Sequence, residues 1–231
     1  MSKNLKLPNI EATTEPPDLP AGCFSSWLRR TRIGLIKERE IDVACGACNA
    51  CCKSSYFIHI RPEETKTLAR IPKQILFPAP GLPKGNMVLG YDEKGCCPML
   101  INDKCSIYEH RPQTCRNYDC RIFTAAGIAA GDDKDLITQQ IRRWKFSYPT
   151  KRDLNLHLAV QAAAKFLRDR ADCFPGGAPP SNSSQLALIA LQVYEVLLKY
   201  NEASGETGLS DIEVAKAIME ANEKFKARRD G

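Results

Sequence analysis

The sequence predicts a mainly α protein in which a loop-rich cysteine metal core, with a small irregular β element, is flanked by helices. Three observations support this class. Nine of the eleven cysteines lie between residues 45 and 120. Short β-branched and aromatic runs accompany them, as is typical of brief strands. After Cys120 the pattern changes to long apolar periods of helical spacing.

Length and composition place the chain among soluble globular proteins. It has 231 residues, 43% of them hydrophobic, which is enough for a full core without disulfide support. No apolar run of signal-peptide or membrane-span length occurs. We therefore expect a cytoplasmic protein without membrane contact. Dense cysteines in a reducing compartment more often hold metal than disulfides.

The net charge of +6 is mildly basic. Basic residues gather at 29–39 and 224–229, but neither run is interleaved with the aromatic side chains that stack on nucleic-acid bases. We interpret both runs as solvated helix surface and do not expect nucleic-acid binding.

The chain begins with a segment that cannot be helical. Four prolines lie within the first twenty residues, so residues 1–22 are expected to be a flexible tail. Ser25 or Ser26 can then cap a helix from Trp27 to about residue 40. This helix leads into Cys45.

Short strands and turns are expected between the cysteines. Residues 56–60 and 87–91 are rich in β-branched, aromatic and aliphatic side chains, which favour strands. Residues 72–86 contain several prolines and glycines and are expected to form a loop. Asn102 and Asp103 form a turn signal between two further apolar pairs.

Helices are expected beyond Cys120. One can be capped by Asp132 or Asp133 and reaches Trp144, and a second covers about 152–170. The complete organisation predicted is a tail at 1–22, a cysteine-cluster metal-binding domain with flanking helices at 23–175, a linker at 176–184, and a C-terminal helical pair at 185–231 that packs on the core. In the last helix, Ser210 and Glu213 have the spacing of a capping box.

The spacing of the first cysteines points to metal chemistry. Cys45, Cys48 and Cys51 form a Cys-x2-Cys-x2-Cys run, which bacterial ferredoxins use to hold a [4Fe–4S] cluster. A zinc ribbon usually has two Cys-x2-Cys pairs, and the second half of this chain has none. The spacing favours an iron–sulfur cluster, and Zn²⁺ remains the alternative.

Cys52 and three histidines have several interpretations. Side chains of neighbours in an extended backbone diverge, so Cys51 and Cys52 are not expected to bind the same ion. Cys52 could serve a second metal, act as a redox thiol or fill space in the core. His59 and His110 are weaker ligand candidates, and His157 falls within a helical pattern. Outside the cluster, Cys23 and Cys173 are expected to be structural.

The cysteine motifs together resemble a known family. Cys45-x2-Cys48-x2-Cys51-Cys52 is followed by Cys97-Pro98, by Lys104-Cys105-Ser106-Ile107-Tyr108-Glu109 with Arg111-Pro112-x2-Cys115, and by Cys120. This order is similar to the YkgJ-type cysteine-cluster family, a zinc- or iron-chelating domain. The resemblance covers about residues 45–120 and implies metal chelation by these cysteines. Where the family has one cysteine before the proline, this chain has Cys96 and Cys97; we choose Cys97 because it directly precedes Pro98.

The candidate metal ligands are therefore eight cysteines: Cys45, Cys48, Cys51, Cys52, Cys97, Cys105, Cys115 and Cys120. The same motif is similar to that of the flagellin lysine N-methylases, which implies an iron–sulfur protein with methyl transfer. No nucleotide-binding, zinc-protease or serine-hydrolase motif is present. Three hypotheses follow: an iron–sulfur protein, a zinc-binding structural or interaction module with a protein partner, and a protein-lysine methylase. No catalytic residue is assigned.

Overall fold

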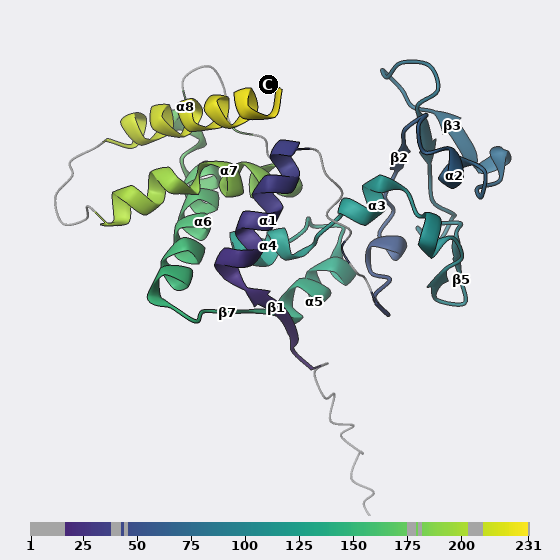
Figure 1. Ribbon diagram of the computed structural model, residues 1–231, viewed down its shortest axis with the longest axis horizontal. Coiled ribbons are helices and arrows are strands. Elements are labelled where there is room, and N and C mark those ends of the chain that lie inside the picture. Colours follow the sequence, from purple (N-terminus) through teal and green to yellow (C-terminus); the bar gives the residue numbers. More distant parts are fainter. Residues whose placement is uncertain are drawn as a thin grey trace, which may run out of the picture.

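The computed structural model describes residues 17–37, 43, 46–174, 179, 182–202 and 210–230. The chain forms two lobes that lie side by side (Figure 1). The helical lobe comprises the described residues of 17–37 and 119–230, and the cysteine lobe comprises residues 46–118. Helices dominate the first lobe and short strands the second, which confirms the mainly α class with a small β element.

The helical lobe is a bundle built around two long helices. α6 and α7 pack along each other, α4 packs against both, α1 lies against α6, and α8 covers α7 (Figure 1). None of the described helices has the length and apolar character needed to cross a bilayer. The helices are α1 (Phe24–Lys37), α4 (Arg121–Ala126), α5 (Asp135–Arg143), α6 (Lys151–Asp169), α7 (Ser183–Glu202) and α8 (Asp211–Asp230).

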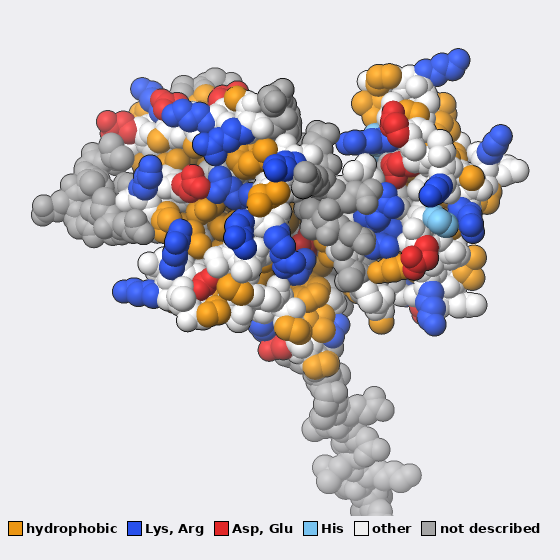
Figure 2. Space-filling view, viewed as in Figure 1, with side chains coloured by type: hydrophobic (Ala, Val, Ile, Leu, Met, Phe, Trp, Pro, Cys, Tyr) orange, Lys and Arg blue, Asp and Glu red, His pale blue; other side chains and the backbone are white. Residues whose placement is uncertain are grey.

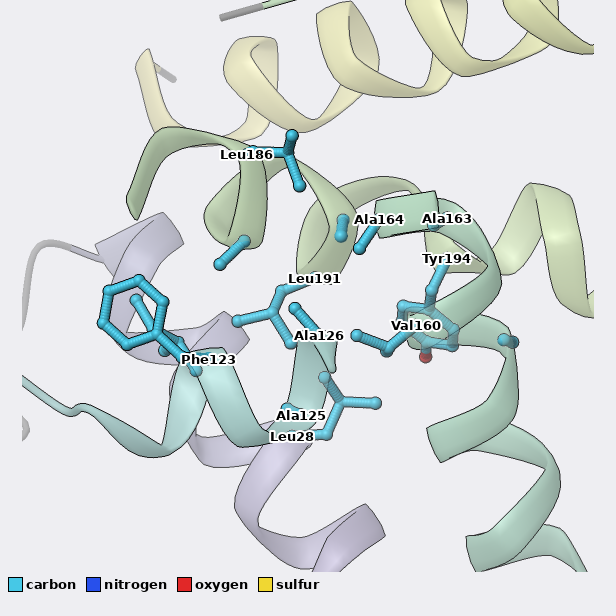
Figure 3. Packing of buried hydrophobic residues seen from close by; sticks show 14 of the residues in the cluster. Leu28, Phe123, Ala125, Ala126, Val160, Ala163, Ala164, Leu186, Leu191 and Tyr194 are labelled. Carbon is cyan, nitrogen blue, oxygen red and sulfur yellow. The ribbon is translucent and has the colours of Figure 1, made fainter. Parts of the chain in front are cut away.

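Small side chains allow these helices to approach closely. Phe123 and Leu191 are fully buried where α4 meets α7 (Figure 3). Around them, alanines of α4 and α6 such as Ala125 and Ala163 are also fully buried. Because alanine adds almost no volume to a helix surface, the backbones come together and the larger side chains fill the remaining space. The result is one continuous core for the lobe.

Helix starts follow the capping chemistry of the sequence. At α8 the hydroxyl of Ser210 accepts a hydrogen bond from the backbone N–H of Glu213 at 3.4 Å, and the Glu213 carboxylate accepts one from Ser210 N–H at 2.7 Å. The predicted capping box is therefore confirmed. Thr150 and Asp153 form a second capping box at the start of α6, which satisfies N–H groups that have no partner inside the helix.

One pairing of strands was not predicted. β1 (Leu19–Cys23) runs parallel to β7 (Trp144–Ser147), with Leu19 opposite Trp144. Residues 19–22 of the segment expected to be a tail are therefore hydrogen-bonded strand, because β7 offers them a paired edge. The helix predicted to reach Trp144 ends at Arg143 instead.

The cysteine lobe is made of short strands joined by turns. β2 (Ile58–Ile60), β4 (Met87–Leu89) and β3 (Leu76–Pro78) form an antiparallel sheet in this order. β5 (Leu100–Ile101) and β6 (Lys104–Cys105) form a hairpin. Its turn residues, Asn102 and Asp103, both have positive φ, which is the type I′ geometry that suits Asn and Asp. β3 lies inside the segment predicted to be a loop. Two short helices complete the lobe, α2 (Thr65–Leu68) and α3 (Gln113–Asn117).

The cysteine lobe has a much smaller apolar core than the helical lobe. Its buried members are six: Ile58, Ile60, Ile71, Leu89, Met99 and Ile107. Cys97, Cys105 and Cys115 pack against them. Because so few apolar side chains are removed from water here, hydrophobic burial stabilises this lobe far less than it stabilises the helical bundle.

His157 lies in the core of the helical lobe and not near the cysteines. Its ring stacks on Phe24 with centroids 4.3 Å apart, and its Nδ1 lies 2.6 Å from the hydroxyl oxygen of Tyr148. Burial lowers its pKa below the ordinary value. The interpretation of His157 as part of a helical pattern is confirmed.

This buried ring predicts how stability depends on pH. Since the unfolded chain keeps a His pKa of about 6.5, it binds the proton before the folded protein does as pH falls. The free energy of unfolding should therefore be unaffected by His157 above pH 6.5 and should decrease below it, by at most about 1.4 kcal/mol per pH unit. Urea titrations of the wild type and of His157→Gln at pH 7.5 and 5.5 check this. The wild type should lose more stability than the variant, and equal losses would contradict the prediction.

Candidate metal centre

Six of the eight candidate cysteines line one cavity in the cysteine lobe. The cavity has a volume of about 850 Å³. The thiols come from four separate segments of the chain, and apolar side chains such as Met99 and Ile107 complete the wall. The cysteines that line it are Cys48, Cys51, Cys52, Cys97, Cys105 and Cys115.

The other two candidates are Cys45 and Cys120. Cys45 falls outside the described residues. Cys120 lines a smaller neighbouring cavity of about 40 Å³, together with Cys48 and Cys51, and its sulfur accepts a hydrogen bond from the indole N–H of Trp144 at 3.2 Å. Cys48 and Cys51 therefore form part of the wall of both cavities. Within the described residues, no three His, Cys, Asp or Glu side chains are arranged to hold one ion.

The backbone joins the cysteine segments directly. The N–H of Cys97 donates to the carbonyl of Cys52 at 2.7 Å, and the N–H of Ser55 donates to Gly95 at 3.0 Å. Gly95 has a φ of +75°, and a Cβ there would lie 2.4 Å from the Ser55 hydroxyl. Glycine at this position lets the two segments approach, and these backbone hydrogen bonds hold the first cysteine run beside the Cys96-Cys97 doublet.

The hairpin turn fastens the other side of the cavity. The Asn49 amide donates to the carbonyl and the carboxylate of Asp103, both at 3.3 Å, and the Lys53 ammonium lies 2.6 Å from the same carboxylate. Sequence reasoning identified the turn at Asn102 and Asp103 but not this contact. The one signal in the sequence for this contact is that the turn lies close to Cys105 along the chain.

The expectation about Cys51 and Cys52 rested on an extended backbone, and that premise is wrong. Cys51–Lys53 is a short 3-10 helix, and both thiols line the same cavity. A hydrogen bond from Cys51 and the positive charge of Lys53 lower the pKa of Cys52 to about 7. That the two thiols do not bind the same ion stays a prediction.

Burial has the opposite effect on the pKa of three other thiols, Cys97, Cys105 and Cys120. It raises the pKa of Cys97 to about 11, raises that of Cys105, and raises that of Cys120 to about 11. Burial therefore favours the neutral thiol at these three positions. Because a metal binds the thiolate, metal binding at these positions must release protons.

Arg111 supplies a buried positive charge to the cavity wall. The residue is 8% exposed, and its guanidinium donates to the carbonyl of Tyr108 at 2.8 Å while lying 4.0 Å from the centroid of that ring. Its charge favours the thiolate form of Cys105. A fixed cation here offsets part of the negative charge that several thiolates would bring.

Among the residues that the structure describes, the remaining cysteines and histidines do not line this cavity. The Cys96 thiol points toward the carbonyl of Lys94 at 3.9 Å, whereas its neighbour Cys97 is part of the wall. His59 lies 2.8 Å from the side-chain oxygen of Asn86. Cys23 donates to the Asp153 carboxylate in the helical lobe at 3.3 Å, and Cys173 lies after α6.

A buried ion pair beside Cys120 lies at the start of α4, at the edge of the helical lobe. Asp119, which is 5% exposed, accepts hydrogen bonds from the Trp27 indole at 2.9 Å and from the Arg121 guanidinium at 2.7 and 2.8 Å. Arg121 also donates to the carbonyl of Ala21 at 3.3 Å. The start of α4 is thereby fixed to β1 and α1.

Removing this carboxylate should be costly. Asp119→Asn leaves the Arg121 guanidinium without its counter-charge, and we expect the free energy of unfolding to fall by about 3 kcal/mol. Asp133→Asn is a matched control because Asp133 pairs with Lys134 at the surface, where such pairs contribute about 1 kcal/mol or less. Urea titration measures both variants. Equal effects of the two substitutions would contradict this role of Asp119.

Comparison with known proteins agrees with the cysteine geometry. No curated protein and no solved structure matches the chain. Residues 44–140 match the model of the CxxCxxCC family, whose description is "Putative zinc- or iron-chelating domain". The matched segment contains all eight candidate ligands and every residue of the large cavity. The resemblance to a zinc- or iron-chelating cysteine family is therefore confirmed over residues 44–140.

Proposed function

We propose that the cysteine lobe binds an iron–sulfur cluster through Cys45, Cys48 and Cys51, with the fourth ligand supplied by Cys97. The observation that carries the proposal is the cavity of about 850 Å³ whose wall contains six thiols. Thiolates are the ligands that both iron–sulfur clusters and Zn²⁺ prefer. The choice between them depends on spacing, space and charge.

The spacing of the cysteines and the volume of the cavity both favour an iron–sulfur cluster over a single Zn²⁺ ion. Cys48 and Cys51 lie in a tight loop that begins at Gly46, which has positive φ, and a Cys-x2-Cys-x2-Cys run presents its thiols to a single cluster. A tetrahedral zinc site requires four sulfurs about 2.3 Å from one ion. The cavity offers more room than one such ion occupies, and this supports a larger inorganic group.

The charge of the wall is suited to such a group. Arg111 and Lys104 line the cavity, and Lys53 lies at its edge beside Asp103. These cations would offset thiolate charge, while the buried apolar side chains would limit access of water. When bound, an iron–sulfur cluster supplies one-electron redox chemistry, and these residues would tune its potential through charge and burial.

The remaining candidate cysteines would act as further metal ligands around this centre. Cys52, Cys105 and Cys115 would hold a second metal or serve as alternative fourth ligands, and Cys120 lies close enough to the Cys48–Cys51 wall to assist from the smaller cavity. The proposal includes a reducing compartment such as the cytoplasm, where these thiols remain available to metal.

Absorption spectroscopy tests the proposal. Protein purified without oxygen should be brown, and the colour should bleach when dithionite is added. A colourless protein that contains zinc and no sulfide would overturn the iron–sulfur assignment and leave the zinc-binding structural module in its place. No feature of the described residues that line the cavity favours methyl transfer, so a lysine methylase is not proposed.

A further inference from the structure

A second cavity lies in the helical lobe and shares no residue with the cysteine cavity. It has a volume of about 690 Å³ and lies where α1, the start of α6, α7 and the end of α8 meet. This volume is within the range of sites that bind small molecules. Four arginines line it: Arg29, Arg32, Arg152 and Arg228.

The fold, and not the sequence, gathers these charges. Arg29 and Arg228 belong to the two basic runs that sequence analysis assigned to solvated helix surface, at opposite ends of the chain. Because α1 packs against both α6 and α8, both runs contribute to one cavity. Figure 2 shows lysine and arginine side chains gathered over α1, with few acidic side chains among them.

The two carboxylates in the cavity wall are already engaged. Glu195 pairs with Arg32 at 2.6 Å. Asp153 accepts hydrogen bonds from the N–H and hydroxyl of Thr150 at 2.9 and 2.5 Å and from the Ser25 N–H at 3.4 Å. Both acids therefore serve the protein itself, and the cavity keeps an excess of positive charge.

Three of the arginines have no acidic partner among the described residues. They are Arg29, Arg152 and Arg228, whose side chains are exposed. Arg32 is held in place by the Tyr194 hydroxyl at 3.1 Å, and its Nε is buried without a hydrogen-bond partner in the described part of the chain. Like charges gathered around one cavity repel each other, and an anion bound between them relieves that repulsion.

We propose that this cavity binds a small organic anion that carries two or more phosphate groups. Planar guanidinium groups bind phosphate through paired hydrogen bonds, and the hydroxyls of Ser25 and Ser26 add further donors. The apolar part of the wall is formed by side chains of α1 that include Leu28, Ile33 and Ile36. That part of the wall fits the organic part of the ligand, as in a nucleotide.

A pair of triple variants tests this site. Arg29→Gln, Arg152→Gln and Arg228→Gln together remove three charges from the cavity. The matched control, Arg30→Gln, Lys151→Gln and Lys216→Gln, removes three charges from exposed positions of the same three helices outside it. The six side chains are exposed, so both proteins should fold, and circular dichroism checks this.

Titration calorimetry with full-length protein measures binding of inorganic pyrophosphate and of adenosine diphosphate. We expect the wild type to bind with a Kd of about 1 mM or tighter, the cavity variant to bind at least about tenfold more weakly, and the control to stay within about twofold. Tighter binding of the nucleotide would support contact with the apolar part of the wall. No binding by the wild type, or equal losses in both variants, would overturn the proposal. Metal content should be the same in all three proteins, which separates this result from the cysteine centre.

Discussion

Replacement of Cys48 by Ser should produce protein that purifies with almost no metal. Cys48 lies between Cys45 and Cys51 in the first cysteine run and lines both cavities, so its loss removes one of the three ligands that this run would present to the cluster. An alcohol is a poor ligand beside thiolates. We expect metal per chain, measured by mass spectrometry after purification without oxygen, to fall at least about tenfold.

The doublet before Pro98 provides the sharpest control for this experiment. Cys97→Ser should deplete metal as Cys48→Ser does, because Cys97 is in the cavity wall. Cys96→Ser, one residue away, should retain the metal of the wild type, as should Cys173→Ser in the helical lobe. Full retention by Cys48→Ser, or equal depletion by Cys96→Ser and Cys97→Ser, would show that the ligands are assigned wrongly.

Removal of the metal should loosen the cysteine lobe and leave the helical lobe intact. The cysteine lobe has only six buried apolar side chains in its core, so bonds between metal and sulfur would supply much of its stability. Structural metals contribute on the order of 10 kcal/mol to the folding of small domains. We expect amide hydrogen exchange in residues 46–118 to accelerate at least about 100-fold after chelation.

The helical lobe is the internal reference for that measurement. Its core is continuous from α1 to α8 and is built from side chains outside the cysteine cavity, with Cys51 packed against its edge. Exchange in α6 and α7 should therefore change by less than about threefold. If exchange in the cysteine lobe is unchanged, the metal does not stabilise it; if α6 and α7 accelerate equally, the two lobes unfold as one unit.

Local signals predicted much of the fold. The capping box at Ser210 and Glu213, the turn at Asn102 and Asp103, and the long helices after Cys120 depend on neighbours in sequence, and all are present. The pairing of β1 with β7 could not be predicted in this way. It joins segments more than a hundred residues apart, and the short strands have no alternating pattern of their own.

The candidate metal site was likewise predictable from the sequence only in part. Spacing and family resemblance identified the cysteines, six of which the fold brings to one cavity. Sequence could not show that Cys51 and Cys52 share that cavity, because their placement depends on a 3-10 helix that has no strong propensity signal. The hydrogen bond from Asn49 to Asp103 and the ion pair of Lys53 with Asp103 likewise depend on tertiary packing. The predicted role of Cys45 lies outside the described residues and stays a prediction.

Anomalous X-ray diffraction from crystals grown without oxygen tests the central claim most directly. Data collected on both sides of the iron and zinc absorption edges locate each metal and identify it. We predict an iron signal inside the cavity, about 2.3 Å from the sulfur atoms of Cys48 and Cys51. A signal only at the zinc edge would contradict the iron–sulfur assignment. A metal located away from these thiols would contradict the metal centre itself.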